Sequence, residues 1–167
     1  RIEFVPQADF GNHMLADIGD GSDQVLILCH MDTVWPRGTT QQRPFRVQDG
    51  IAYGPGVLDM KAGIAITLHA LGSLRELERL PKQRVRILFN SDEELGSTTS
   101  QQLIQDEAKK STHVLCPEPS FGKEGALKTA RKGVGMFTMK VTGRAAHAGN
   151  DPQIGISAVE EMAHQII

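Results

Sequence analysis

Six side chains in this sequence belong to the types that bind divalent metals or move protons, and they occur in four short segments. They are His30, Asp32, Asp59, Glu93, Glu94 and Glu118. Imidazole together with several carboxylates is a good ligand set for zinc or a related divalent ion. A carboxylate can also bridge two ions, and two-metal sites activate a water and hold the carbonyl that it attacks. The residue types therefore favour metal-assisted hydrolysis.

The spacing inside the segments suggests how these roles could be divided. Asp32 follows His30 by two residues, so the two lie on one face of an extended chain, where Asp32 can accept the second ring N–H of a metal-bound His30. Glu93 and Glu94 are adjacent, and adjacent side chains of an extended backbone point in opposite directions. One of them could bind metal while the other faces the substrate as general base.

Each segment taken alone has an ordinary structural explanation. Asp59 could begin a helix, residues 92–94 could form a solvated acidic turn, and Glu118 could lie in a surface loop between two prolines. A shared site is favoured because the four segments occur at successive strand exits along the chain.

Apolar patterns predict the elements that would position these segments. Continuous apolar runs predict strands buried on both faces at residues 25–29, 85–89 and 114–116. A helix is expected over about residues 61–77, with Ile64, Leu68 and Leu71 inward, and a second after Ser97, with Leu103, Ile104 and Ala108 inward. The alternation of strands and helices predicts an α/β fold with a mainly parallel sheet. Ligands of such sheets bind beyond the carboxyl ends of the strands, so we expect the segments to converge there.

The pattern changes after Lys132. Phe137, Met139 and Val141 alternate with polar residues, which predicts a strand with one wet face. Asp151 then has the position of an N-cap with Pro152 as first helical residue, followed by an apolar stripe up to Ile167. We interpret residues from about 131 onward as the opening of a second, smaller domain, and the sequence as part of a longer chain.

Composition excludes several classes of partner. The 167 residues carry 18 basic and 20 acidic side chains, a net charge of −2, so nucleic acid is not an expected partner. The longest apolar run, residues 25–29, is too short to span a bilayer, so no membrane partner is expected. The compartment is left open between cytoplasm and periplasm, with the cytoplasm slightly favoured.

The ordered motifs resemble those of the dinuclear zinc exopeptidase and amidohydrolase family. They are His-Met-Asp-Thr-Val at 30–34, Tyr-Gly-Pro-Gly-x-x-Asp-x-Lys-x-Gly at 53–63, Phe-Asn-x-Asp-Glu-Glu-x-Gly-Ser at 89–97 and Glu-Pro at 118–119. The resemblance extends from about Val25 to Ile167 and is strongest to the family's glutamate carboxypeptidases. Acetylornithine deacetylase and succinyl-diaminopimelate desuccinylase belong to the same family.

The resemblance implies a fold, a cofactor and a ligand set. Residues 1–130 would be the N-terminal part of a zinc-peptidase catalytic domain, and residues 131–167 the beginning of an α+β lid and dimerisation domain. Two zinc ions are implied. His30 and Glu118 would bind the first, Glu94 the second, and Asp59 would bridge both, with a cis peptide bond between Asp59 and Met60.

The resemblance also implies catalytic roles. Asp32 would orient His30, and Glu93 would be the general base. His147, in the motif at residues 143–149, would reach across a homodimer interface to stabilise the oxyanion in the partner's active site. The alternative for His147 is an exposed turn histidine. A further zinc-binding histidine and the arginines that bind the substrate carboxylate lie in later segments of the family, beyond Ile167.

The implied function is hydrolysis of an amide or peptide bond next to a free carboxylate in a small peptide or N-acyl amino acid. A glutamate carboxypeptidase is the leading expectation. The alternatives are an N-acyl amino acid deacylase or aminopeptidase using the same metals, and a non-catalytic binding or assembly homologue. The presence of Glu93 and of every ligand expected in this span disfavours the last.

Overall fold

The computed structural model describes residues 1–167, which divide into two compact units, Arg1–Leu127 and Lys128–Ile167. The division lies close to the change of pattern seen in the sequence near residue 131. Each unit is described by itself.

A five-stranded sheet forms the centre of the first unit, with the strand order β1-β2-β6-β3-β7. The bounds are β1 Ile2–Val5, β2 His13–Ile18, β3 Gln24–His30, β6 Arg84–Asn90 and β7 Ser111–Leu115. β3 is parallel to both β6 and β7, while β1 and β2 join antiparallel beside β6. The predicted α/β fold is confirmed, and the three parallel strands are those predicted from apolar runs. The third begins and ends earlier than expected, so Cys116 lies outside it.

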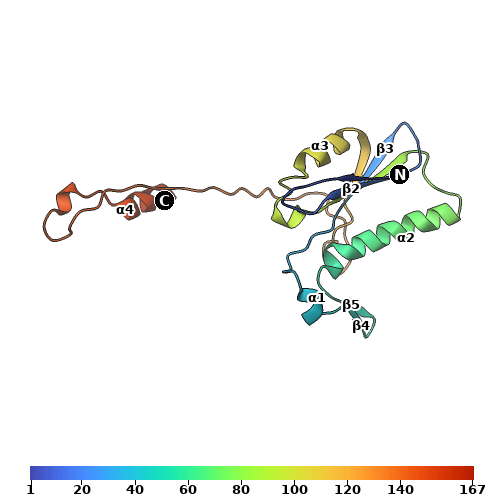
Figure 1. Ribbon diagram of the computed structural model, residues 1–167, viewed down its shortest axis with the longest axis horizontal. Coiled ribbons are helices and arrows are strands. Elements are labelled where there is room, and N and C mark those ends of the chain that lie inside the picture. The colour runs from blue at the N-terminus through green and yellow to red at the C-terminus, as the bar shows by residue number, and fades with distance from the viewer. The chain divides into compact units, whose positions relative to one another are not determined.

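Helices α2 (Ala62–Glu76) and α3 (Gln101–Lys109) cover opposite faces of this sheet (Figure 1). Alternate residues of β3 explain the arrangement: Ile27 packs in one apolar cluster with Leu71 of α2, and Leu26 packs in another with Leu103 of α3. A strand covered on both faces has no wet side, which accounts for its unbroken apolar sequence.

The inward face of α2 differs from the predicted stripe. Gly63, Thr67 and Leu71 are buried and Ile64 is partly buried, whereas Leu68 is 54% exposed. Because Gly63 has no side chain, the start of the helix comes close to the Pro117 carbonyl.

The segment before α2 breaks the helical geometry. The stretch Val57–Glu76 is long and apolar enough to be a candidate membrane span, but Asp59 and Met60 within it have non-helical backbone angles. The regular helix of 15 residues is shorter than the roughly 20 that a span needs, and one of its faces packs on the sheet.

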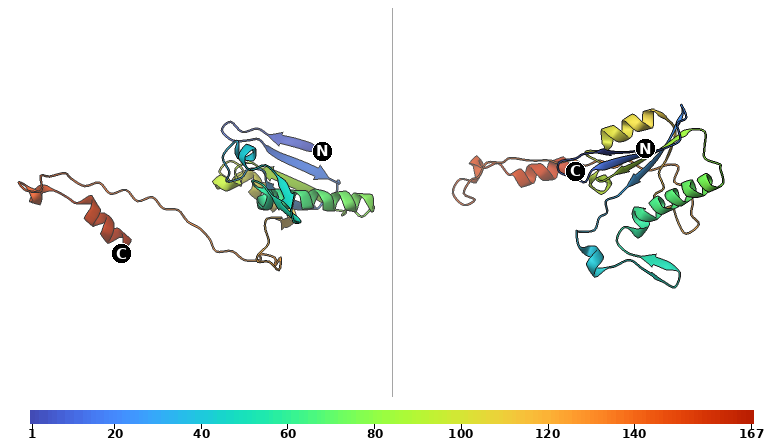
Figure 2. Two further views of the ribbon diagram at one scale, coloured as in Figure 1. Left: turned by 90° about the horizontal axis from the view of Figure 1, so that it is seen from below. Right: turned by 45° about the vertical axis from the view of Figure 1, so that its right-hand side comes forward.

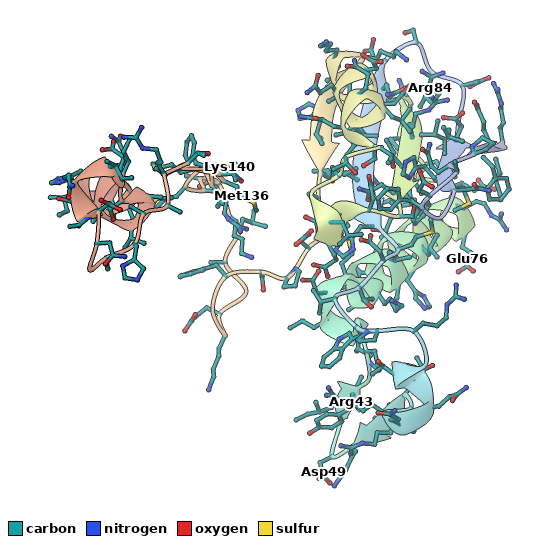
Figure 3. All side chains as sticks on the ribbon, turned by 60° about the vertical axis from the view of Figure 1, so that its left-hand side comes forward. Arg43, Asp49, Glu76, Arg84, Met136 and Lys140 are labelled. Atoms are coloured by element: carbon teal, nitrogen blue, oxygen red, sulfur yellow. The ribbon has the colours of Figure 1, made fainter.

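A small extension lies between β3 and α2. It contains helix α1 (Thr39–Gln42) and the antiparallel hairpin of β4 (Arg46–Gln48) and β5 (Ile51–Tyr53), none of which the sequence analysis predicted. Figure 2 shows this extension outside the sheet, on the side of α2. Figure 3 shows Arg43 and Asp49 in it, at the opposite end of the unit from Arg84, the first residue of β6.

The second unit contains less regular structure than predicted. The expected strand at residues 137–141 is wrong: these residues form no strand, because no other segment of this unit pairs with them. Asp151 precedes only a short 3₁₀ turn, Pro152–Ile154. The helix, α4 (Ala158–Ile166), begins later and is capped by Ser157, whose hydroxyl accepts the Glu160 N–H at 3.1 Å.

Candidate metal centre

The site is built at the carboxyl ends of the parallel strands. His30 is the last residue of β3 and pairs in register with Asn90, the last residue of β6. The Met31 N–H continues the pairing, donating to the Asn90 carbonyl at 2.8 Å. The loop after β6, which carries Glu93 and Glu94, therefore begins beside His30. The predicted convergence at one edge of the sheet is what the structure shows for these segments.

The His30 imidazole is buried, with 2% of the residue exposed, and its two nitrogens face different groups. Nε2 lies 3.0 Å from Asp59 Oδ1 and 3.6 Å from Glu118 Oε1. Nδ1 lies 3.1 Å from the Asp32 carbonyl oxygen and 3.5 Å from Asp32 Oδ1. Acceptors thus face both ring nitrogens, so each can donate a proton in this structure, and Nε2 is the one directed at Asp59 and Glu118. Burial lowers the pKa of His30, but hydrogen bonds with Asp59 and Asp32 more than offset this and raise it.

Asp32 connects the imidazole to the loop after β6. Its Oδ2 accepts the Glu94 N–H at 2.9 Å, while Oδ1 is buried without a hydrogen-bond partner. A buried carboxylate oxygen beside a ring N–H is the arrangement that accompanies histidines bound to metal. This unpartnered oxygen fits the orienting role that the sequence predicts for Asp32.

Two groups of three side chains have ligand atoms within 4.8 Å of one another. The groups are His30 with Glu93 and Glu118, and His30 with Asp59 and Glu94. All the predicted ligands thus lie together, and one imidazole with several carboxylates suits zinc or a related divalent ion. The grouping differs from the one expected, because Glu93, predicted as a base, lies beside Glu118.

Glu93 and Glu94 lie on a turn and not on an extended chain. Residues Glu93–Leu95 form a single 3₁₀ turn, in which successive side chains are about 120° apart. The two carboxylates still enter different groups, as the sequence argument required, but for this different geometric reason. Burial raises the pKa of the Glu93 carboxyl, which suits a group that must accept a proton.

The backbone around Asp59 also contributes to the site. The peptide bond between Asp59 and Met60 is cis, as the family resemblance implied. Met60 is buried, and its sulfur accepts the His30 N–H at 3.0 Å. The segment that carries Asp59 is thereby held against the end of β3.

Sequence reasoning missed the buried polar residues beneath this turn. Asp92, Asn90 and His13 are almost completely buried. All three hydrogen-bond to the pair Thr99 and Ser100, just before α3. Asp92 was interpreted only as part of an acidic run, and His13 lies about 80 residues away. No local pattern signals such burial.

His147 belongs to the second unit, where its ring is held by the local backbone. Nδ1 accepts the N–H groups of Gly149 and Asn150, each at 3.1 Å. A neutral ring whose Nδ1 is an acceptor carries its proton on Nε2. His147 therefore presents an exposed N–H donor. Its predicted catalytic role stays a prediction.

Comparison with known proteins gives a consistent family. A family model described as "Peptidase family M20/M25/M40" matches residues 26–167. Carboxypeptidase G2 of Pseudomonas sp. (strain RS-16) is 38% identical over 158 residues, which are 94% of this chain and 38% of that protein. Acetylornithine deacetylase of Pasteurella multocida (strain Pm70) is 34% identical over 155 residues, covering 90% and 38%. The chain therefore spans about two fifths of the length of these relatives.

Solved structures share the fold. An aminopeptidase PepT from Bacillus cereus ATCC 10987 superposes with a TM-score of 0.63 at 21% identity, covering 90% of this chain and 41% of that one. An M20 family metallo-carboxypeptidase, Sso-CP2, from Sulfolobus solfataricus gives a TM-score of 0.61 at 19% identity, covering 75% and 30%. At these identities the likeness concerns the fold.

Proposed function

We propose that this chain, which belongs to peptidase family M20/M25/M40, forms part of an enzyme that hydrolyses an amide or peptide bond next to a free carboxylate. The observation that carries the proposal is the convergence of four carboxylates on one buried imidazole, two of them directly at its Nε2. Glutamate release from a peptide or N-acyl substrate is the preferred activity, supported by the 38% identity to carboxypeptidase G2. Deacylation of another N-acyl amino acid is the second candidate, supported by the 34% identity to acetylornithine deacetylase.

Divalent metal would be held by His30, Asp59, Glu94 and Glu118, and we propose zinc because this ligand set suits it. Two ions are proposed, with one further ligand from outside this span. Such ions lower the pKa of a bound water and polarise the carbonyl that it attacks. The acceptors of Asp32 would hold the ring proton at Nδ1 when Nε2 gives up its own proton to bind metal.

Glu93 moves the proton in the proposed reaction. Its carboxylate accepts a proton from the attacking water as the new C–O bond forms at the carbonyl carbon. The same carboxyl then gives the proton to the amide nitrogen, the C–N bond breaks, and an amine and a carboxylate leave. A carboxyl with a pKa raised by burial is suited to both transfers.

His147 would supply an N–H to the oxyanion that develops on the attacked carbonyl. Its Nε2–H is free to donate because Nδ1 is already an acceptor of two backbone N–H groups. We propose that it acts on the active site of a partner subunit in a homodimer.

The proposal is tested by separating metal binding from turnover in the full-length protein. Glu93→Ala should lower kcat by about 10²–10⁴-fold, the range of a general base, with metal content nearly unchanged. Glu94→Ala should lower metal content first. Metal is measured by mass spectrometry after gel filtration, and Asp106→Asn, a change at a half-buried carboxylate of α3 that is hydrogen-bonded to Gln102, is the control. If Glu94→Ala alone loses activity and keeps its metal, the division of roles is wrong.

The substrate class is tested by comparing N-acyl glutamates with N-acetylornithine. Preference for the first supports a glutamate carboxypeptidase and preference for the second a deacylase. If metal binds and neither class nor a dipeptide series is cleaved, the chain is a binding homologue and the proposed activity fails.

A further inference from the structure

One buried residue, Asp92, connects the turn that carries Glu93 and Glu94 to the start of α3. The Asp92 carboxylate is completely buried and accepts four hydrogen bonds. Oδ2 accepts from Thr99 N at 2.6 Å, from Thr99 Oγ1 at 2.8 Å and from Ser100 N at 3.3 Å, and Oδ1 accepts from Ser100 Oγ at 2.6 Å. A single side chain thus satisfies the backbone donors just before α3.

The Asp92 main chain holds the same turn at its other side. Its carbonyl accepts the N–H groups of Leu95 at 3.3 Å and Ser97 at 2.7 Å. Ser97 adopts a left-handed backbone conformation with φ of 54°, which turns the chain back toward Asp92. The segment 92–100 is therefore a loop whose two ends meet at Asp92, and Glu93 and Glu94 lie in the turn that directly follows this residue.

A directed chain of hydrogen bonds supports the carboxylate from β2. The single hydroxyl proton of Thr99 goes to Asp92 Oδ2, so Thr99 Oγ1 must accept from His13 Nε2, 3.0 Å away. His13 Nδ1 is then the acceptor for the Ser91 N–H at 3.3 Å. Both nitrogens of the completely buried His13 are used in this arrangement.

A second buried polar side chain supports the carboxylate from β6. Asn90 Nδ2 donates to Ser100 Oγ at 3.0 Å, and that hydroxyl donates to Asp92 Oδ1. Both carboxylate oxygens are therefore supported by side chains that the strands of the sheet fix in place. Buried polar networks that are fully paired specify one geometry, because each alternative leaves a buried group without a partner.

We propose that Asp92 is a positioning residue for the metal centre, fixing from the core side the turn whose outer side is held by Asp32 through the Glu94 N–H. The carboxylate does not enter either group of candidate ligands. It acts on the placement of Glu93 and Glu94, and its effect on turnover rests on the proposed function. The competing explanation is that Asp92 stabilises the fold and nothing more.

The test compares two hydrogen-bonded carboxylates in the full-length protein, the buried Asp92 and the half-buried Asp17. Asp92→Asn removes one acceptor of the network. Asp17→Asn, the control, weakens the ion pair between Asp17 and Arg86, which joins β2 to β6 away from the site. Both variants lose folding stability. The properties that separate them are zinc affinity, measured by competition with a chelator, kcat against KM, and amide exchange of residues 93–97 in the metal-free protein.

For Asp92→Asn we expect zinc affinity at least about 10-fold weaker, the lower end of what supporting partners contribute. We expect kcat lower by on the order of 10²-fold with KM little changed, since misplacement by about 1 Å has that cost. Exchange should become faster at residues 93–97. Asp17→Asn should leave all of these as in the wild type. Equal zinc affinity, kcat and local exchange in the two variants would make Asp92 a structural residue and overturn the proposal.

Thr99→Val keeps the test decisive if Asp92→Asn does not fold. It removes the hydroxyl between His13 and Asp92 and leaves the backbone donors of Thr99 and Ser100 in place. Faster exchange at 93–97 with weaker zinc binding is the expected result, and unchanged values contradict the proposal. If no substrate is cleaved by the wild type, the proposed function fails, but zinc affinity and exchange still decide the role of Asp92.

Discussion

At the scale of single residues, two histidines have opposite hydrogen-bond environments at Nδ1. In the buried His30 both nitrogens face acceptors, Nδ1 the Asp32 carbonyl and Nε2 the carboxylates of Asp59 and Glu118. Nδ1 of the exposed His147 faces two N–H donors, so its proton is on Nε2. His30 therefore directs Nε2 at the candidate metal site, whereas His147 presents an Nε2–H that can donate a hydrogen bond.

His147→Ala should therefore lower kcat without loss of zinc. One donor to an oxyanion contributes about 2.7–4 kcal/mol, or roughly 10²–10³-fold in kcat. Steady-state kinetics and metal analysis of the full-length protein check this. Mixed dimers of His147→Ala and Glu93→Ala subunits should regain activity, since one of their two sites has both residues. A lack of recovery after verified subunit exchange would argue against action between subunits.

The sequence predicted the outer residues of the site and missed the inner ones. His30, Glu94 and Glu118 lie at or just after the ends of parallel strands, where a local pattern places them at one edge of the sheet, and Asp59 joins them from the turn before α2. Asp92 looks like part of a solvated turn because its partners are distant: Thr99 comes from beyond the turn and His13 from another strand. Burial that depends on such contacts has no local signature.

At the scale of elements, the start of α2 is pressed against the loop that carries Glu118. A β-carbon on Gly63 would lie 1.8 Å from the Pro117 carbonyl oxygen, so only glycine allows this approach. α2 follows directly from the Asp59 segment, and Pro117 precedes Glu118. The contact therefore sets the separation of two candidate ligands.

Gly63→Ala should weaken zinc binding, because the added methyl group moves the Pro117–Glu118 loop away from the helix. A loss of about 10-fold or more in zinc affinity is expected, comparable to the loss of a supporting partner. Gly72→Ala is the matched control in the same helix: a β-carbon there meets nothing within 4 Å. It should stabilise the fold by about 0.5–1 kcal/mol with unchanged zinc affinity. Equal zinc affinity in both variants would show that the Pro117–Glu118 loop can move to accommodate the methyl group without weakening the zinc site.

Strands were predictable from the sequence where helices cover both of their faces, because such strands consist of apolar residues. The apolar runs of β3 and β6 identified strands because both faces are covered. Residues 137–141 have an equally clear alternation but form no strand, since a strand requires a partner as well as a pattern. β1 and β2 were missed because their sequences mix polar and apolar residues with no regular spacing.

At the scale of the whole first unit, a network of ion pairs joins three strands and a helix. Arg86 of β6 donates from Nε and Nη2 to the two carboxylate oxygens of Asp17 on β2, each at 2.8 Å, and Nη1 lies 3.1 Å from Glu107 Oε2 on α3. Gln24 of β3 and Lys110 also donate to Glu107. The network is largely buried, so its charges are weakly screened.

The network makes the fold sensitive to acid. The hydrogen bond from Arg86 is the main cause that lowers the pKa of Asp17. Burial raises the pKa of Glu107, but hydrogen bonds from Lys110 and Gln24 more than offset this and lower it. Both carboxyls then bind protons more weakly in the folded than in the unfolded chain. Their stabilisation is complete above the unfolded pKa values of about 4 and is lost as pH falls through the lowered ones.

We therefore expect the contribution of Asp17 and Glu107 to the free energy of unfolding to be constant from about pH 7 to pH 5 and to fall steeply below pH 4. Urea unfolding followed by circular dichroism at each pH measures this. Asp17→Asn should cost about 1.5–3 kcal/mol at pH 7, the range for hydrogen bonds to charged groups, and much less at pH 3, where the wild-type carboxyl is itself becoming protonated. Asp106→Asn, at a half-buried carboxylate of α3 outside this network, should leave the pH dependence unchanged. If Asp17→Asn costs as much at pH 3 as at pH 7, the acid sensitivity arises elsewhere in the molecule.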